Sequence, residues 1–466
     1  MRLLQLHIIL LMCLLSARAM AQDGTLYLSK DDVLSIVKAY HPVIKQANLK
    51  VDRSKAEVMS ARGSFDPYLK TNAKQKTFDG KLYYNYFNPE LKLPTWYGIE
   101  FKAGAEEVYG SRVFNELTPG KSVYAGVKVS VLQGLLFDER RATLRKAQAI
   151  QEMTEAEQRL VVNNILFEAV ATYWNWVREY QTYLIYKEVV QISTARLNFV
   201  RLEYEQGNRP AIDTVEAWTQ IQSYELLKNE ALMNYYNAGF ELSTYLWLED
   251  RSMMSWSDNI EPDSTAQNIS SVEVDGLETF LAQALANHPK LQMVDAKLDA
   301  LKIEKRLKGQ SLLPTLDINA NLLNKGYEVP NELTTPFIEN NYKFGVDFSV
   351  PLFLRKGRGG YRSAKIKLQE TAFEQDYTSA NIENKIRSYY NEVIILKNQI
   401  ELYTEAYNNF NKMYRGELTR YNVGESTLFL VNSRENKMLQ AQQKLIALKT
   451  KWSKSYAGLL WAAAYL

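Results

Sequence analysis

Residues 382–414 read IENKIRSYYNEVIILKNQIELYTEAYNNFNKMY. Apolar and tyrosine side chains recur here at alternating steps of four and three residues, without a break: Ile382, Ile386, Tyr389, Val393, Leu396, Ile400, Tyr403, Tyr407, Phe410 and Tyr414. A mean spacing of about 3.5 residues is typical of helices that wind around their neighbours in a left-handed supercoil. No proline interrupts residues 358–421. We therefore expect one helix over that range, on the order of 95 Å long at about 1.5 Å per residue.

The same kind of spacing predicts a second long helix over about 138–204. A glycine-containing turn follows each long helix, at Gly207 in the first case and at Gly424 in the second. A shorter helix is then expected to return, over about 211–248 and about 427–461 respectively. The sequence pattern of each half thus predicts a long hairpin of two helices.

Pairs of strands are expected within about 66–132 and about 314–352. In the second pair, apolar and polar residues alternate over 315–322 and again over 342–350, as in strands with one apolar face. Runs of roughly 9–11 residues suffice for tilted strands to cross a bilayer. A soluble antiparallel sheet with one wet face would alternate in the same way. Because the pattern occurs twice, each time before a very long helix, it favours membrane strands.

The chain is internally duplicated. His41 and His288 each end a short predicted helix and are each followed by a proline that restarts the helix. We predict a first repeat over 22–248, a polar connector over 249–274 and a second repeat over 275–466. Two copies of one plan indicate that each copy needs a partner to bury its apolar faces.

The N-terminus has the features of a secretory signal peptide, predicted over 1–21. Its apolar core, Leu3–Leu15, is too short to span a membrane, and Ala19-Met20-Ala21 forms a cleavage site. The only cysteine of the chain, Cys13, lies inside this segment. We therefore expect an exported protein whose mature chain has no thiol. The net charge of +3 suggests no nucleic-acid partner.

No enzyme is expected. Besides lacking a thiol, the predicted mature chain has no glycine-rich phosphate loop and no histidine cluster. Its only two histidines, His41 and His288, each precede a proline that restarts a helix, which explains them as structural residues. The sequence accordingly predicts no catalytic residue, no metal site and no cofactor.

Four predicted strands cannot close a barrel, and open sheet edges do not occur in lipid. The strands must then be shared between several copies of the chain, each of which also supplies about four helical rods. Such an assembly would form a membrane barrel of strands continued by a helical tube. The excess sequence of the first strand pair, about 78–120, contains a hairpin turn signal, Asp79-Gly80. We expect it to form an additional hairpin outside the barrel proper.

The alternative is a periplasmic coiled-coil adaptor or scaffold protein without a pore. It would explain the long helices and the export. It would not explain two pairs of alternating strands, each placed at the end of a full-length helix.

The sequence resembles the TolC family of outer-membrane efflux proteins over essentially all of the predicted mature chain. The resemblance rests on the order and spacing of six motifs: AYHPVIK, YEQGNRPAIDTVEA, ANHPKLQ, SLLPTLDINANL, FGVDFSVPLF and YNVGESTLFLVNS. It implies a homotrimer with a 12-stranded β-barrel in the outer membrane and a 12-helix α-helical coiled-coil barrel in the periplasm. It also implies docking to a periplasmic adaptor (membrane fusion) protein and an inner-membrane pump.

The resemblance implies a periplasmic gate at the helix turns. The family pairs a tyrosine and an aspartate that correspond to Tyr421 and Asp213. Two acidic positions that narrow the mouth in the family are Leu430 and Ser433 here, while the matching positions of the first half are Asp213 and Glu216. We expect these five residues to form the gate, with an apolar constriction. The alternative is that Tyr421 only continues the apolar stripe of its helix and that Asp213 only caps the helix after Pro210.

The exposed turns are expected to dock the adaptor through Gly207, Asn208, Gly424 and Glu425. The predicted function is a passive exit duct of a tripartite efflux or type I secretion system. Since nothing in the chain is expected to bind nucleotide, the energy would come from the inner-membrane partner.

Overall fold

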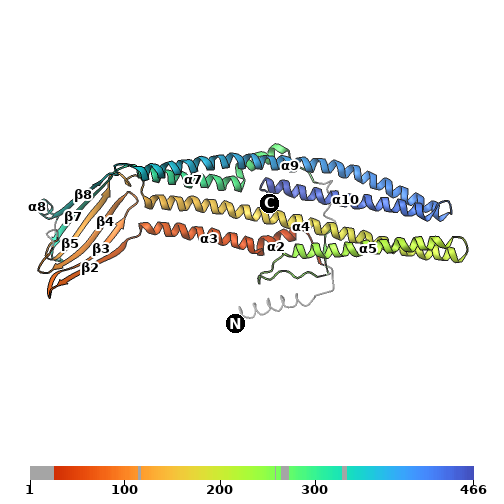
Figure 1. Ribbon diagram of the computed structural model, residues 1–466, viewed down its shortest axis with the longest axis horizontal. Coiled ribbons are helices and arrows are strands. Elements are labelled where there is room, and N and C mark those ends of the chain that lie inside the picture. Colours follow the sequence, from red (N-terminus) through yellow and green to blue (C-terminus); the bar gives the residue numbers. More distant parts are fainter. Residues whose placement is uncertain (1–25, 114–116, 258, 264–271, 328–332) are drawn as a thin grey trace, which may run out of the picture. The chain divides into compact units, whose positions relative to one another are not determined.

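The chain is mainly helical and contains one large sheet (Figure 1). A computed structural model describes residues 26–113, 117–257, 259–263, 272–327 and 333–466, so the predicted signal peptide lies outside the described residues. The elements are β1 (Leu26–Leu28), α2 (Lys30–Tyr40), α3 (Pro42–Arg62), η1 (Gly63–Phe65), β2 (Tyr68–Phe78), β3 (Lys81–Pro94), β4 (Ile99–Tyr109), β5 (Gly120–Ser130), α4 (Glu139–Glu205), α5 (Ala211–Ser243), β6 (Ile260–Pro262), α6 (Leu277–Asn287), α7 (Pro289–Gln310), β7 (Thr315–Lys325), α8 (Thr335–Asn340), β8 (Tyr342–Ser349), α9 (Arg355–Asn422) and α10 (Leu428–Ala462).

The chain folds into two compact units. One, here called the sheet unit, consists of Asn48–Gln158 and Pro289–Ser379. The other, here called the hairpin unit, consists of the described residues up to Ala47, Arg159–His288 and Ala380–Leu466. Each unit takes segments from both halves of the sequence, which is the arrangement expected when two repeats bury their faces against each other.

The two predicted long helices are present. Helix α4 has 67 residues and α9 has 68. The stripe that predicted α9 is the side that α9 buries, and Ile386, Val393 and Tyr421 are at most 1% exposed. In α4, Val170, Val177 and Leu184 recur every seven residues in the sequence; the first two are buried, whereas Leu184 is 38% exposed. The spacing of apolar residues therefore predicted the buried faces of both helices, with this one exception.

The two histidine–proline steps have the same geometry. His41 and His288 cap α2 and α6 with extended backbones (φ −61° and −65°), and each backbone N–H donates to the carbonyl four residues earlier. A proline then begins the next helix in each case. Because an extended residue is what a following proline favours, these steps are built by local backbone chemistry, and both histidines are buried.

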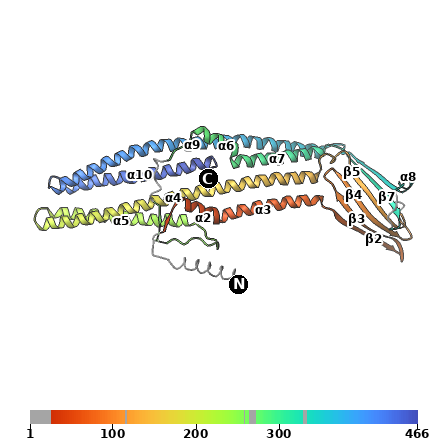
Figure 2. The same cartoon turned by 180° about the vertical axis from the view of Figure 1, so that it is seen from behind.

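The large sheet has six antiparallel strands in the order β2-β3-β4-β5-β7-β8 (Figures 1 and 2). This corrects the expectation of four strands with an additional hairpin outside them. The additional hairpin, β3–β4, lies between β2 and β5 and pairs with both. The sequence pattern identified the faces of these strands, but the alternation of a strand does not specify its neighbours.

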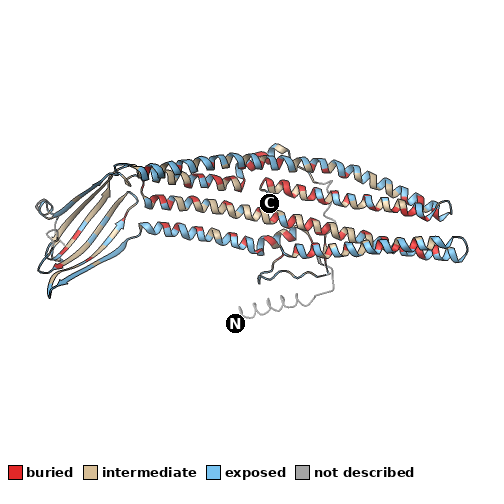
Figure 3. Ribbon diagram, viewed as in Figure 1, coloured by how far each residue is buried: buried red, intermediate tan, exposed pale blue. Residues whose placement is uncertain are grey.

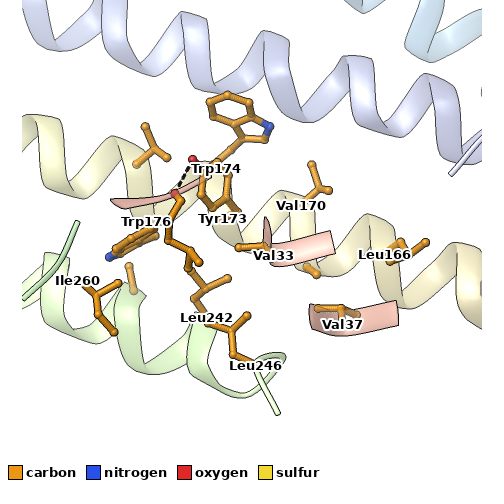
Figure 4. Close-up of a cluster of buried hydrophobic side chains, with 14 of the residues drawn as sticks. Val33, Val37, Leu166, Val170, Tyr173, Trp174, Trp176, Leu242, Leu246 and Ile260 are labelled. Atoms are coloured by element: carbon orange, nitrogen blue, oxygen red, sulfur yellow. Dashed lines mark hydrogen bonds between the residues drawn. The ribbon is translucent and has the colours of Figure 1, made fainter. Parts of the chain in front are cut away.

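The main core of the hairpin unit is rich in aromatic residues (Figure 4). Helix α4 contributes Tyr173, Trp174 and Trp176, which pack against Val33 of α2 and Leu242 of α5. The Tyr173 hydroxyl donates a hydrogen bond to the carbonyl of Leu28 in β1 at 3.2 Å. Buried residues follow stripes along the helices, with exposed residues on the opposite sides (Figure 3). The helices are thus amphipathic, as packed soluble helices are.

Among the described residues, no helix combines the length and the apolar character needed to cross a membrane.

Two helical glycines offer a matched test of this packing. Gly239 of α5 is buried, and a Cβ there would lie 2.5 Å from the indole ring of Trp256. Gly416 of α9 is exposed, and a Cβ there would meet nothing within 4 Å. We expect Gly239→Ala to lower the free energy of unfolding by about 1–3 kcal/mol, because Trp256 must move within a packed core.

The control, Gly416→Ala, should instead raise stability by up to about 1 kcal/mol through helix propensity. Thermal unfolding of the detergent-solubilised protein, followed by circular dichroism, measures both changes. A stabilised Gly239→Ala variant would show that Trp256 does not pack closely against α5.

Candidate functional site

Both hairpin turns use the same backbone device. Gly207 and Gly424 have left-handed geometry, with φ +77° and +81°. The N–H of the next residue donates to a carbonyl five residues back, Asn208 to Glu203 and Glu425 to Arg420, each at 2.9 Å. This Schellman arrangement ends a helix cleanly and favours glycine because a side chain at this φ is strained. The four predicted docking residues of these turns are all exposed: Gly207, Asn208, Gly424 and Glu425.

Tyr421 lies in a small core just behind the turns. Its side chain is 1% exposed and packs with residues from α4, α5, α9 and α10: Leu197, Val200, Ala217, Ile221, Tyr414, Leu428 and Val431. The two hairpins therefore share one apolar core at their ends. Figures 1 and 2 show these ends side by side.

Arg209 connects Tyr421 with Asp213. Its guanidinium lies 4.0 Å from the centre of the Tyr421 ring, and its Nη2 donates to the Tyr421 carbonyl at 3.4 Å. Its Nη1 lies 3.6 Å from Oδ2 of Asp213. The Tyr421 hydroxyl is buried and has no hydrogen-bond partner among the described residues. The expected tyrosine and aspartate thus come together, but through an arginine rather than by a direct hydrogen bond.

The environment of Tyr421 keeps its hydroxyl protonated. Burial raises the pKa of Tyr421, and the charge of Asp213 adds to this effect while that of Arg209 opposes it. The contact between Arg209 and the ring does not depend on the hydroxyl, because it is an attraction between a cation and the face of the aromatic ring.

A second polar layer lies farther from the turns, at Arg196 of α4, eleven residues before Gly207, and at Glu435 of α10, eleven residues after Gly424. The two side chains form a bidentate ion pair, with Nη2–Oε1 at 2.6 Å and Nη1–Oε2 at 2.9 Å. Arg196 also donates to the Tyr414 hydroxyl at 2.9 Å, and the Tyr224 hydroxyl donates to Glu435 at 3.0 Å. One side chain from each of α4, α5, α9 and α10 therefore meets in this layer.

The ion pair of this layer is deeply buried, with side-chain exposures of 8% for Arg196 and 2% for Glu435. Burial alone would lower the pKa of Arg196, but the hydrogen bonds and charge of Glu435 outweigh it and raise that pKa. Burial and the charge of Glu435 also raise the pKa values of Tyr224 and Tyr414. The layer thus consists of one ion pair and two neutral tyrosines.

Glu216 joins this layer through Asn432. The Asn432 side chain donates to Oε1 of Glu216 at 3.1 Å and accepts from Nη1 of Arg196 at 3.2 Å. The other two predicted gate residues differ: Leu430 is 41% exposed and Ser433 is half-buried. The structure therefore ties Glu216 into the interior and leaves Leu430 on the surface.

Glu417 braces the second turn from inside. Its carboxylate accepts from the Ser426 hydroxyl at 2.6 Å and lies 3.8 Å from the guanidinium of Arg434. These contacts join the end of α9 to the start of α10. They hold the two helices of this hairpin together, whereas Arg196 and Glu435 join one hairpin to the other.

Sequence reasoning did not identify Arg196, Arg209 or Glu435. A signal was present, because Glu435 falls on the same helical stripe as Leu428, Val431 and Leu439, which is otherwise apolar. A charged residue on a buried stripe needs a buried partner. Its partner is a distant arginine, and the sequence does not indicate which one.

In the described part of the chain, no group of three or more His, Cys, Asp or Glu side chains is arranged to hold a metal ion. The arrangement instead joins two helical hairpins at their ends, through an aromatic–cation contact and a buried ion pair.

Comparisons with known proteins agree with this architecture. Residues 280–464 match the family model described as outer membrane efflux protein. A search of curated protein sequences finds no match.

Several solved structures of outer-membrane channels share the fold. The Campylobacter jejuni CmeC outer membrane channel superposes with a TM-score of 0.65 at 15% identity, covering 94% of this chain and 85% of CmeC. Vibrio cholerae VceC gives 0.64 at 14% identity, covering 93% and 96%. The open state of the Neisseria gonorrhoeae MtrE channel gives 0.63 at 12%, covering 93% and 88%.

These findings confirm the resemblance predicted from the motifs. The likeness to the solved structures is one of fold, since the identities are low. The chain therefore matches the outer membrane efflux protein model over residues 280–464 and has, over more than nine-tenths of its length, the fold of solved outer-membrane channels.

Proposed function

We propose that the chain is the outer-membrane channel of a tripartite efflux or type I secretion system. Three copies would form a passive duct that crosses the outer membrane and extends into the periplasm. The duct would dock through its turns to a periplasmic adaptor protein and an inner-membrane pump, which would supply the energy. The family match and the channel fold support this proposal. The alternative, a scaffold protein without a pore, does not explain why the sheet exposes an apolar face.

The observation that carries the mechanism is the buried Arg196–Glu435 ion pair between the two hairpins. A duct that opens at its periplasmic end must move one hairpin away from the other. Opening would separate the two charges and would break the charge-assisted hydrogen bonds of the closed state, which contribute about 1.5–3 kcal/mol each. The pair would therefore hold the closed state until the docked partner repays that cost with contacts made only in the open state.

The contact between Arg209 and Tyr421 would act as a second, weaker latch closer to the turns. Cation–π contacts contribute about 0.5–2 kcal/mol, more where they are shielded from water. Asp213 would hold Arg209 in place, and Glu216 would hold Asn432 against Arg196. In this proposal Leu430 and Ser433 would line the constriction between neighbouring copies, with Leu430 as its apolar part.

We expect Glu435→Gln to increase the open probability of the channel. The substitution keeps the side-chain size but removes the counter-ion of Arg196. A hydrogen bond to a charged group contributes about 1.5–3 kcal/mol, so the equilibrium should shift roughly 10- to 150-fold toward the open state. Single-channel recording in planar bilayers measures this shift.

The matched control is Glu383→Gln, which breaks the pair formed by Glu383 and Arg387 one helical turn apart in α9, with side chains 39% and 48% exposed. This surface substitution should leave the open probability unchanged. If Glu435→Gln gives a folded channel that opens no more often than the control, the buried pair is not the latch.

Because Arg209 contacts the ring of Tyr421 and not its hydroxyl, substitutions can distinguish the contribution of the ring from that of the hydroxyl. Tyr421→Phe should leave the conductance unchanged, because the hydroxyl has no hydrogen-bond partner among the described residues and the ring contact remains. Arg209→Met and Tyr421→Leu should each raise the open probability, because each removes the cation–π contact.

These three variants are compared in the same bilayer recordings. A large increase in Tyr421→Phe would instead indicate that the hydroxyl bonds to a group outside this chain. An unchanged open probability in Arg209→Met would show that the contact between Arg209 and Tyr421 does not hold the channel closed.

A further inference from the structure

The β3–β4 hairpin pairs with a neighbouring strand on each side over most of its length. Strand β2 pairs with β3 from Tyr68↔Lys92 to Phe78↔Lys81, and β4 pairs with β5 from Ile99↔Val129 to Val108↔Gly120. Strands β3 and β4 have 14 and 11 residues, against 11 in each of β2, β5 and β7. The hairpin is thus as long as the strands that the sequence predicts to cross the membrane.

The apolar face continues across the hairpin without a gap. One row of paired residues crosses all six strands through Leu69, Leu91, Ala103, Ala125, Leu322 and Tyr342. The hairpin contributes exposed apolar side chains to this face, with Leu91 40% and Phe101 48% exposed. Exposed side chains of this size on a continuous apolar face are suited to contact with lipid.

The adjacent row of the opposite face is polar. It runs through Tyr68, Lys92, Lys102, Gly126, Asn321 and Lys343. In the hairpin, Lys92 lies 3.1 Å from Glu90 and 3.6 Å from Glu100, and the Tyr124 hydroxyl of β5 donates to Glu90 at 2.8 Å. A polar face of this kind is suited to a water-filled lumen.

Strand β3 also compensates for a proline in its interior. Pro89 has no N–H to donate, and the ladder between β3 and β4 omits the pairs at Asn88 and Pro89. The Asn88 side chain donates instead to the carbonyl of Ala105 at 3.3 Å, the residue that the register places opposite Pro89. Proline is normally confined to sheet edges, and this substitute bond satisfies the Ala105 carbonyl where Pro89 cannot, so that β3 can pair on both sides.

Both ends of the hairpin have features of membrane interfaces. Tyrosines gather near the end formed by the start of β3 and the end of β4: Tyr83, Tyr84, Tyr86 and Tyr109. At the other end, Trp96 lies 5.3 Å from Phe65, which ends η1, and Glu100 lies 3.1 Å from Arg140 in α4. The hairpin therefore spans the same distance as β2 and β5, with aromatic residues at both limits.

The six strands leave two edges that fit each other. No strand pairs with the outer edge of β2 or of β8 among the described residues. Since the number of strands is even and all neighbours are antiparallel, β2 and β8 run in opposite directions. The β8 edge of one copy can therefore continue the antiparallel ladder along the β2 edge of the next, and lipid tolerates no unpaired edge.

We propose that the β3–β4 hairpin is part of the membrane wall, and that three copies close an 18-stranded barrel in which β2 of each copy pairs with β8 of its neighbour. This inference rests on the proposed function. Strands about 4.8 Å apart and tilted by about 40° give a diameter of about 36 Å for 18 strands and about 24 Å for 12.

Cysteine mapping in outer-membrane vesicles tests this proposal on the full-length protein. The only native cysteine, Cys13, lies in the predicted signal peptide. Single variants probe the two faces of the hairpin, Leu91→Cys against Lys92→Cys and Phe101→Cys against Lys102→Cys. The reference pair on β8 is Phe344→Cys against Lys343→Cys, and the probe is a charged maleimide that cannot enter lipid.

We expect the lysine positions of the hairpin to react several-fold faster than their apolar neighbours, as in β8. A fluorophore attached at Leu91→Cys should be quenched by nitroxide-labelled lipid. Equal labelling within the hairpin, together with alternation in β8, would place the hairpin outside the wall and overturn this inference, while the channel would stand. Loss of alternation in β8 as well would contradict the proposed channel itself. Circular dichroism and gel mobility of each variant verify that it is folded and assembled.

Discussion

Arg196 is a charged residue whose side chain is buried in the folded chain. Its side chain is 8% exposed, and its two terminal nitrogens, Nη1 and Nη2, donate hydrogen bonds to Glu435, Tyr414 and Asn432. An uncompensated charge at this depth would cost several kcal/mol, so the helices that supply its partners must pack in one particular register. Because α4, α5, α9 and α10 all contribute, this requirement fixes how the two hairpins meet.

The apolar stripes alone do not fix the register in which the helices pack. Leucine, isoleucine and valine at heptad positions pack almost equally well after a shift of one heptad, and coiled coils often use one buried polar residue to exclude such shifts. In the hairpin unit, Arg196 and Glu435 have that role between the hairpins, and Glu417 has it within the second hairpin. The same groups that specify the register are those that must separate if the hairpins move. In the proposed mechanism, specificity of packing and resistance to opening would therefore come from one ion pair.

The sequence predicted most of the fold and less of the site. Long helices and alternating strands have periodic signals that depend only on local spacing, and so α9 and β7 were expected close to their observed bounds. The position of β3–β4 was wrong because pairing partners are a non-local property that alternation does not encode. Arg209 and Arg196 were missed for the same reason: each is defined by a residue more than two hundred positions away, Tyr421 and Glu435 respectively.

Strands β3 and β4 differ from the other strands of the large sheet in how they connect to the helices. Strands β2, β5, β7 and β8 each connect directly to a helical segment, whereas β3 and β4 connect only to other strands. Inserting one hairpin between β2 and β5 therefore lengthens the sheet by two strands without adding a helix. It also preserves the alternation of strand direction, because two strands are added together, and so both edges remain able to pair with another copy. A single added strand would make the edges parallel and break that match. The smallest insertion that can widen a shared antiparallel barrel is thus a hairpin, and β3–β4 has that form.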